Sequence, residues 1–227
     1  MAAASERGID EERAAKLRAL PPYKPWFYTL VRRSSAVILH GVFRISVDGL
    51  ENVPATGGVV LAPMHRSYLD TLAIGVSLRP RRFRAMAKYE LFFVPLIGRA
   101  IALGGGFPVR RGVQDMEAYD RAMELLRAGT LLLVFPEGTR NRDGKARPQL
   151  GAARLALDAG AAFVPVAIEG TERIKLMPPR FPKVRVRYLP PIPLGDLPAD
   201  DLRRASHAAT KRWTEAIEAA LVQLRAL

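Results

Sequence analysis

From residue 45 onward, short apolar segments alternate with longer segments in which apolar residues recur every three or four positions. The short segments have the composition of buried strands, and the longer ones have the period of amphipathic helices. The predicted strands are 45–48, 58–62, 83–87, 106–109, 131–135, 163–168 and 184–189. The predicted helices are 68–78, 91–102, 113–128, 150–159 and 199–225. This alternation predicts an α/β fold, a single domain with a mostly parallel central sheet flanked by helices.

Two further helices are predicted before this domain. Residues 9–20 form a short amphipathic pattern that ends at Pro21 and Pro22, and residues 25–45 carry one apolar stripe with aromatic residues at its start. A helix in a membrane interface has this pattern, and so does a helix packed on a protein core. We therefore divide the chain into an N-terminal amphipathic segment, 1–44, with both roles open, and a domain at 45–227.

Composition limits the partners and the compartment. The formal net charge is +13, and most of the basic residues are arginine. Such a charge favours anionic partners, although an arginine-rich genome produces the same excess. The chain has no cysteine, which excludes disulfides and a thiolate nucleophile. We expect neither a signal peptide nor a transmembrane helix, because no suitable apolar run occurs.

A histidine and an aspartate follow the second predicted strand, in the segment MHRSYLD. On a continuous helix, five residues of separation would turn His65 and Asp70 away from each other. They can meet if His65 lies in the turn before the helix and Asp70 in its first turn, and the spacing of Ser67 and Asp70 predicts Ser67 as the helix N-cap. Asp70 would then hold Nδ1 of His65, which leaves Nε2 as a base. The alternative is that Asp70 only caps the helix.

Two other strand ends carry groups suited to an anion. Arg110 and Arg111 follow GGGFPV, and the segment FPEGTR, residues 135–140, follows an apolar strand. Its turn can offer backbone N–H groups while Arg140 clamps the anion. Glu137 could pair with an arginine or accept a hydrogen bond from a substrate hydroxyl. Polar groups at such strand ends form sites in α/β sheets.

Several other classes of protein are disfavoured by missing motifs. The chain contains no P-loop, no G-x-S-x-G elbow and no H-E-x-x-H motif. Three scattered histidines without cysteine make a metal site improbable. No zinc-finger or aromatic RNA-binding signature occurs, so we predict no nucleic-acid partner.

Taken together, these segments resemble the lysophosphatidic acid acyltransferase family of membrane-associated glycerolipid acyltransferases. That family has, in order, H-x4-D, F-x-x-x-R, F-P-E-G-T-R and V-P-V segments. Here they are His65 with Asp70, Phe107 with Arg111, residues 135–140 and residues 164–166, and Lys88 in AKYELFFVPLIG matches a further family pattern. Two positions depart from the usual family pattern, with Met64 where asparagine is common and Arg110 where aspartate is common.

The resemblance implies transfer of a fatty acyl group from acyl-CoA or acyl-carrier protein to a lysophospholipid hydroxyl, typically that of 1-acyl-glycerol-3-phosphate, which gives phosphatidate. His65 would be the general base, oriented by Asp70, and backbone N–H groups near the helix start would stabilise the oxyanion. Arg111 and Arg140 would bind the acceptor phosphate. The predicted substrate-binding residues are Lys88, Arg111, Glu137, Gly138, Thr139 and Arg140.

No cofactor or metal is required by this reaction, in which acyl-CoA or acyl-carrier protein is a co-substrate. The resemblance also implies an anionic membrane surface as a partner and a peripheral or monotopic location on the cytoplasmic face of the cell membrane. Two alternatives stay open, namely acylation of another lysophospholipid or a glycolipid, and a non-catalytic anionic-lipid-binding protein.

Overall fold

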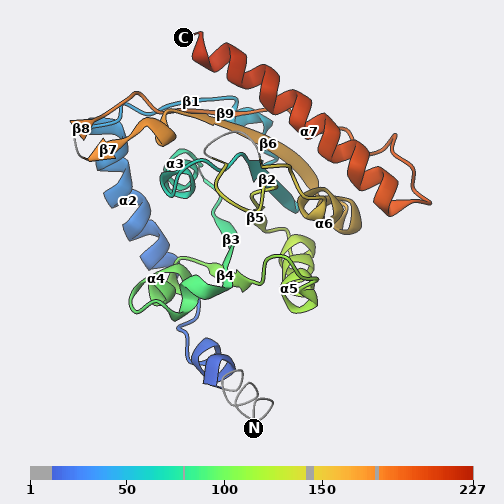
Figure 1. The fold of residues 1–227 in the computed structure, drawn as a ribbon, viewed down its shortest axis with the longest axis horizontal. Coiled ribbons are helices and arrows are strands. Elements are labelled where there is room, and N and C mark those ends of the chain that lie inside the picture. Colours follow the sequence, from blue (N-terminus) through green and yellow to red (C-terminus); the bar gives the residue numbers. More distant parts are fainter. Residues whose placement is uncertain (1–11, 79, 142–145, 177–178, 227) are drawn as a thin grey trace.

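The central feature of the fold is a single mixed sheet. The computed structural model describes residues 12–78, 80–141, 146–176 and 179–226, and in this part of the chain seven strands pair in the order β1-β9-β6-β2-β5-β3-β4 (Figure 1). Its strands are β1 (Ser46–Asp48), β2 (Val59–Pro63), β3 (Phe83–Lys88), β4 (Gly106–Val109), β5 (Leu131–Leu133), β6 (Ala162–Glu169) and β9 (Arg185–Tyr188). Neighbours run parallel except β6 and β9, so the predicted mostly parallel sheet is confirmed.

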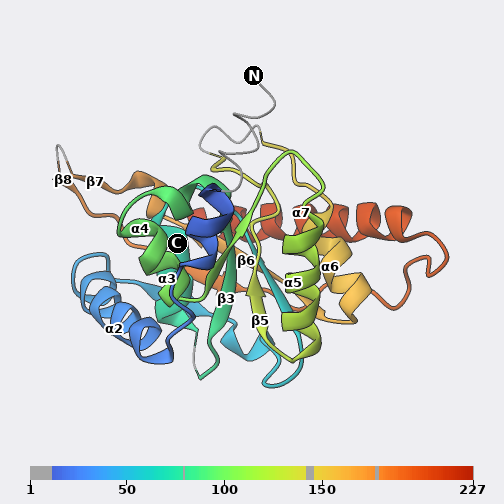
Figure 2. The ribbon, with the colours of Figure 1, turned by 90° about the horizontal axis from the view of Figure 1, so that it is seen from below.

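Helices cover both faces of this sheet (Figures 1 and 2). On one face lie α2 (Pro25–Gly41) and α3 (Leu69–Ser77), and on the other lie α5 (Met116–Arg127), α6 (Gly151–Ala159) and α7 (Leu202–Arg225). The shorter elements are α4 (Ile97–Leu103), η1 (Leu50–Asn52), η2 (Tyr89–Phe93), η3 (Thr171–Arg173) and the antiparallel pair β7 (Lys175–Leu176) and β8 (Pro179–Arg180). A single domain with helices on both faces is the predicted architecture.

The central strand β2 shows why helices are needed on both faces. Along β2, Val60 and Ala62 pack with α5, α6 and α7, whereas Val59 and Leu61 pack with α2 and α3. All four residues have no accessible surface. Such a strand is stable only when both sheet faces are covered, which accounts for its unbroken apolar sequence.

The N-terminal segment begins with a helix at residues 12–18, and the remaining residues of the predicted helix at 9–11 lie outside the described residues. The next helix, α2, ends at Gly41 and not at residue 45, because Phe43 and Ile45 turn into the core. One side of α2 packs on α3 and the sheet through Tyr28 and Leu39. None of the helices in the described part of the chain is long and apolar enough to cross a membrane.

The predicted helix at 91–102 is wrong as a continuous element. The structure has the 3₁₀ turn η2, an interruption at residues 94–96 and then α4. Pro95 has no N–H to donate and disfavours helical geometry in Val94, so one uninterrupted helix cannot form here. Other boundaries differ from the predicted ones by up to four residues, the largest difference being at α2.

The position of β2 in the sheet determines which segments meet. β2 pairs with β5 on one side and with β6 on the other. The segments that follow β2, β5 and β6 therefore emerge side by side at the same edge of the sheet, because parallel strands share one carboxyl end.

Candidate active site

His65 and Asp70 meet directly after β2. His65 Nδ1 lies 3.0 Å from Asp70 Oδ2, and both side chains are buried. His65 precedes α3 and Asp70 lies in its first turn, as the sequence predicted. Because the carboxylate accepts the Nδ1–H, the ring is held in the tautomer whose Nε2 is free of a proton. Nε2 is thus the nitrogen left to take a proton from a substrate.

Asp70 is held by three further donors. The backbone N–H groups of Arg66 and Ser67 donate to Oδ2 at 2.7 and 2.8 Å, and Thr171 Oγ1 donates to Oδ1 at 2.6 Å. Hydrogen bonds of this kind fix the orientation of the carboxylate. The N–H groups of Arg66 and Ser67, two of those near the helix start, are thus bound to Asp70 and are not free to stabilise an oxyanion.

The predicted N-cap is also displaced by one residue. α3 begins at Leu69 with Tyr68 as its N-cap residue, and Tyr68 makes no side-chain capping bond. Ser67 Oγ instead accepts from the N–H of Leu69 at 3.3 Å, while the Ser67 N–H donates to Asp70. The reciprocal contact of a capping box is therefore present, although Ser67 lies one position before the cap.

Glu137 holds the backbone of His65 and does not line the cavity. Its Oε2 accepts the His65 N–H at 2.6 Å, and its Oε1 accepts from Asn141 Nδ2 at 2.7 Å. Asn141 in turn donates its N–H to His65 O at 2.6 Å. Burial raises the pKa of Glu137, and the bonds from Asn141 and His65 oppose that rise. No ion pair between Glu137 and an arginine occurs among the described residues, and both oxygens of its carboxylate bind groups of the protein.

The FPEGTR segment also supplies the surface on which the imidazole rests. The ring of Phe135 stacks on that of His65, with 3.9 Å between centroids and 27° between planes. Gly138 has φ of +63° and closes a turn in which its N–H donates to Phe135 O at 3.0 Å. That conformation favours glycine, and it turns Thr139 and Arg140 toward the cavity.

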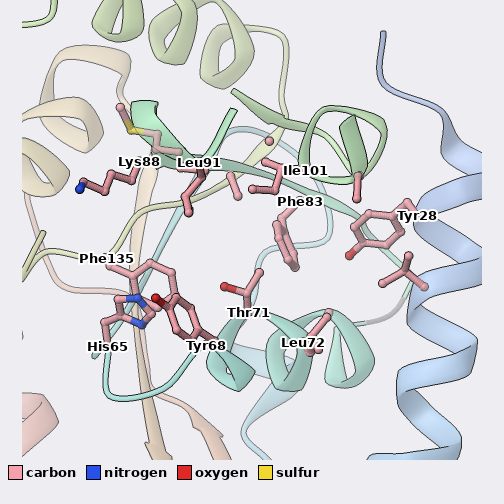
Figure 3. A pocket seen from close by; sticks show the side chains of 18 of the residues that line it. Tyr28, His65, Tyr68, Thr71, Leu72, Phe83, Lys88, Leu91, Ile101 and Phe135 are labelled. Carbon is pink, nitrogen blue, oxygen red and sulfur yellow. The ribbon is translucent and has the colours of Figure 1, made fainter. Parts of the chain in front are cut away.

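A largely apolar cavity of about 620 Å³ opens beside His65. Figure 3 shows it extending from His65, Tyr68 and Phe135 at one end to Tyr28 and the helix α2 at the other. Its walls come from α2, α3, β3, η2, α4 and the FPEGTR segment. The volume falls within the range of about 300–1,000 Å³ that is typical of small-molecule sites.

Cationic side chains lie at the same cavity. Lys88, Arg111 and Arg140, three of the predicted substrate-binding residues, all line it. The guanidinium of Arg140 lies 3.9 Å from the ring centroid of Tyr68, and Lys88 lies 3.5 Å from Glu90. Partial burial lowers the pKa of Arg111, and the nearby charge of Arg140 lowers it further. Two neighbouring guanidinium groups repel each other until an anion lies between them.

The two departures from the usual family pattern lie away from the cavity. Met64 is buried among the side chains under α5, α6 and α7. Arg110 is exposed, with its guanidinium 4.9 Å from the ring centroid of Tyr89. Neither residue lines the cavity beside His65.

Sequence reasoning missed four residues of the site: Phe135 as the stacking partner, Tyr68, Asn141 and Thr171. Phe135 and Asn141 belong to or follow the recognised FPEGTR segment, so their proximity to His65 had a signal in the sequence. Thr171 had none, because it lies 101 residues from Asp70 and follows a different strand.

Comparison with known proteins agrees with this geometry. The family model described as Acyltransferase matches residues 44–169, which is more than half of the chain. The chain is 33% identical over 161 residues to the chloroplastic 1-acyl-sn-glycerol-3-phosphate acyltransferase of Arabidopsis thaliana, covering 67% of this chain and 44% of that protein. It is 29% identical over 197 residues to the 1-acyl-sn-glycerol-3-phosphate acyltransferase of Bacillus subtilis, covering 87% of this chain and 96% of that protein.

A solved structure is also similar. The crystal structure of the 1-acyl-sn-glycerophosphate acyltransferase PlsC from Thermotoga maritima superposes with a TM-score of 0.70 at 25% identity, covering 88% of this chain and 80% of that one. The chain spans less than half the length of the first plant relatives that it matches. The matched region nonetheless contains the paired histidine and aspartate and the FPEGTR segment, and the chain belongs to the acyltransferase family.

Proposed function

We propose that this protein transfers a fatty acyl group from a thioester donor, acyl-CoA or acyl-carrier protein, to the free hydroxyl of 1-acyl-glycerol-3-phosphate, which yields phosphatidate. The observation that carries the proposal is the position of His65. Its Nδ1 is held by Asp70, and its ring lies at an apolar cavity that Arg111 and Arg140 also line. A base, an anion-binding pair and room for an acyl chain are thus combined in one place.

In the proposed reaction, His65 Nε2 accepts the proton of the acceptor hydroxyl as the oxygen attacks the thioester carbonyl carbon. The tetrahedral intermediate collapses, the carbon–sulfur bond breaks, and the imidazolium returns its proton to the leaving thiolate. Asp70 stabilises the transient positive charge on the ring. Phe135 and Glu137 keep the ring and its backbone in place, so little reorganisation is needed when charge develops.

Recognition of the acceptor is assigned to the cationic residues at the cavity. Arginine binds phosphate through two parallel N–H bonds, and Arg111 and Arg140 are close enough to influence each other electrostatically. The apolar remainder of the cavity suits an acyl chain, because its walls present mostly aliphatic and aromatic side chains. Lys88 and Thr139 lie at the same cavity and complete the proposed acceptor site.

A panel of acceptors tests the proposal. Purified protein is incubated with labelled acyl-CoA or acyl-carrier protein and with 1-acyl-glycerol-3-phosphate, other lysophospholipids or a glycolipid, and the acylated product and free thiol are measured. We expect phosphatidate to be the main product, and His65→Ala to lower the rate by about 10²–10⁴-fold. Greater acylation of another acceptor would change the substrate assignment. Lipid binding without thiol release would identify a non-catalytic lipid-binding protein.

We further propose that α2 docks on an anionic membrane surface on the cytoplasmic face, as a peripheral or monotopic attachment. Trp26, Leu30, Val37 and Ile38 are exposed on α2 although other residues of this helix pack on the core. Exposed aromatic and aliphatic residues next to arginines are typical of interfacial helices. In this proposal, one side of α2 packs on the protein core and the opposite side lies in the membrane interface.

The two tryptophans provide a direct test of this attachment. Trp26 is 63% exposed on α2, whereas Trp213 is buried and donates to Ala62 O. Brominated lipids in phosphatidylglycerol vesicles should quench Trp26 and spare Trp213, and Trp26→Phe identifies the quenched component. Unquenched fluorescence in both, with no cosedimentation at low salt, would contradict the docking of α2.

A further inference from the structure

A second apolar surface lies outside α2, at the turn between η2 and α4. Residues 94–97 have the sequence VPLI, and Val94, Leu96 and Ile97 are all exposed. Leu96 is 80% exposed, more than any other large hydrophobic residue among those the structure describes. None of these three side chains lines the cavity or belongs to the core clusters. Their exposure in one short turn therefore has no explanation in the packing of the domain.

The backbone of this turn forces Leu96 outward. Leu96 has φ of 64° and ψ of −44°, and the N–H of Ile97 donates to Pro95 O at 2.7 Å. This is a γ-turn of the rare, strained kind, and a leucine is poorly suited to positive φ. Glycine or asparagine would relieve the strain at this position. Strain that serves no packing role is typical of functional positions.

The helix α4, which begins at the end of the 94–97 turn, contacts α2 and lines the cavity. Lys24 N–H donates to Leu103 O at 2.9 Å, which ties the start of α2 to the last residue of α4, and the two helices are in contact (Figure 1). α4 has seven residues and is therefore only about 10 Å long. Between them, α2 and α4 contribute Val31 and Ile101 to the cavity wall. α2 and α4 therefore both border the cavity that a lipid would enter.

Charge indicates which partner covers this surface. α2 and α4 contain no acidic residue, and they carry Arg32, Arg33 and Arg99. Glu90, which precedes the turn, is paired with Lys88. An apolar tip flanked by two helices that carry arginines and no acidic residue is complementary to an anionic lipid interface, and the arginines would repel those of a second copy.

We propose that the 94–97 turn is a second membrane contact, which inserts Leu96 into an anionic bilayer beside α2. With two contacts on either side of the cavity, the bilayer surface faces the route to His65, and a lysolipid need not leave the membrane fully to be acylated. The proposal rests on the proposed function for the identity of the lipid substrate. The membrane contact itself is argued only from the exposure, backbone geometry and charged surroundings of the 94–97 turn.

The absence of cysteine makes the test direct, because a single introduced cysteine is labelled uniquely. Leu96→Cys and Val222→Cys, each carrying an environment-sensitive fluorophore, are mixed with phosphatidylcholine–phosphatidylglycerol vesicles that contain brominated lipid. Val222 is the matched control, since it is an aliphatic residue that is 70% exposed on α7, on the opposite face of the sheet. We expect a blue shift and quenching at residue 96 and neither at residue 222.

Leu96→Asn measures the contribution of the side chain, because asparagine tolerates positive φ and the turn should be retained. We expect this variant to bind the same vesicles about tenfold more weakly, with an unchanged or raised melting temperature. Val222→Asn should change the binding by less than about twofold. Leu96→Asn should turn over a short-chain, monomeric acceptor in solution at the rate of the wild type.

The outcomes separate this proposal from the proposed function. Quenching of Trp26 without any response at residue 96 would overturn the second contact and leave α2 as the attachment. Shielding of the label at residue 96 without vesicles, with a concentration-dependent change in mass, would replace the bilayer with a second copy. Wild-type protein that binds vesicles through residue 96 but acylates no acceptor would refute the proposed function alone.

Discussion

Thr171 Oγ1 donates a 2.6 Å hydrogen bond to Asp70 Oδ1, so a residue that follows β6 fixes the carboxylate that orients His65. Both residues are almost completely buried. The other oxygen of Asp70 is occupied by His65 and by backbone N–H groups. Thr171 therefore controls the orientation of Asp70 without itself reaching the cavity, and it is a positioning residue of the candidate site.

Thr171→Val should lower kcat by about tenfold, because it leaves one oxygen of a buried carboxylate without its donor, at a cost of roughly 1–3 kcal/mol. The KM for the acceptor should stay near the wild-type value. Thr171→Ser restores the hydroxyl and should recover most of the lost rate. Steady-state kinetics at several pH values check this, and a loss of thermal stability that matches the loss of activity in both variants would indicate a purely structural role.

Arg111→Ala and Arg140→Ala should each raise the KM for 1-acyl-glycerol-3-phosphate by about tenfold or more, because each removes charge-assisted bonds to phosphate. The KM for an unphosphorylated monoacylglycerol should not change. Arg110→Ala is the matched control, since Arg110 is adjacent in sequence but lies over Tyr89 and not at the cavity. Equal effects on phosphorylated and unphosphorylated acceptors would argue against phosphate binding by these arginines.

Tyr68 should matter through Arg140, whose guanidinium lies over its ring. Tyr68→Leu removes the aromatic face and should raise the acceptor KM roughly threefold, which corresponds to a cation–π contact of about 0.5–1 kcal/mol at an exposed site. Tyr68→Phe keeps the face and should behave as the wild type. If both substitutions raise the KM equally, the hydroxyl and not the ring is the important group.

Glu137 should make stability depend on pH. Burial raises the pKa of its carboxyl in the folded protein, so the native state holds this proton more tightly than the unfolded state does. The stabilisation is fully present below the ordinary glutamate pKa and is lost as the pH rises through the raised value. The melting temperature of the wild type, measured relative to that of Glu137→Gln, should therefore be highest at acid pH and fall toward neutrality.

Glu218→Gln serves as the control for that comparison, because Glu218 is exposed on α7 and its replacement reports only the general loss of a carboxylate. A difference between wild type and Glu137→Gln that is flat or of opposite slope would contradict the direction of the Glu137 shift.

The sequence by itself determined the class of fold, and it predicted the contact of His65 with Asp70 as one of two alternatives. The spacing of apolar residues along the chain predicts strands and helices locally. A separation of five residues across a helix start leaves few geometries in which an imidazole and a carboxylate can meet. The same local character made FPEGTR recognisable, since an apolar strand that ends in a charged turn has little structural purpose of its own.

Only the tertiary structure decided which distant groups complete the site. Thr171 reaches Asp70 because β6 pairs with β2, and Glu137 reaches the His65 backbone because β5 pairs with β2 on the other side. Strand order depends on the burial of many residues at once, so no local pattern reports it. The interruption at Pro95 likewise turned an expected helix into an exposed turn, and the direction in which Leu96 points follows from backbone geometry and not from its residue type.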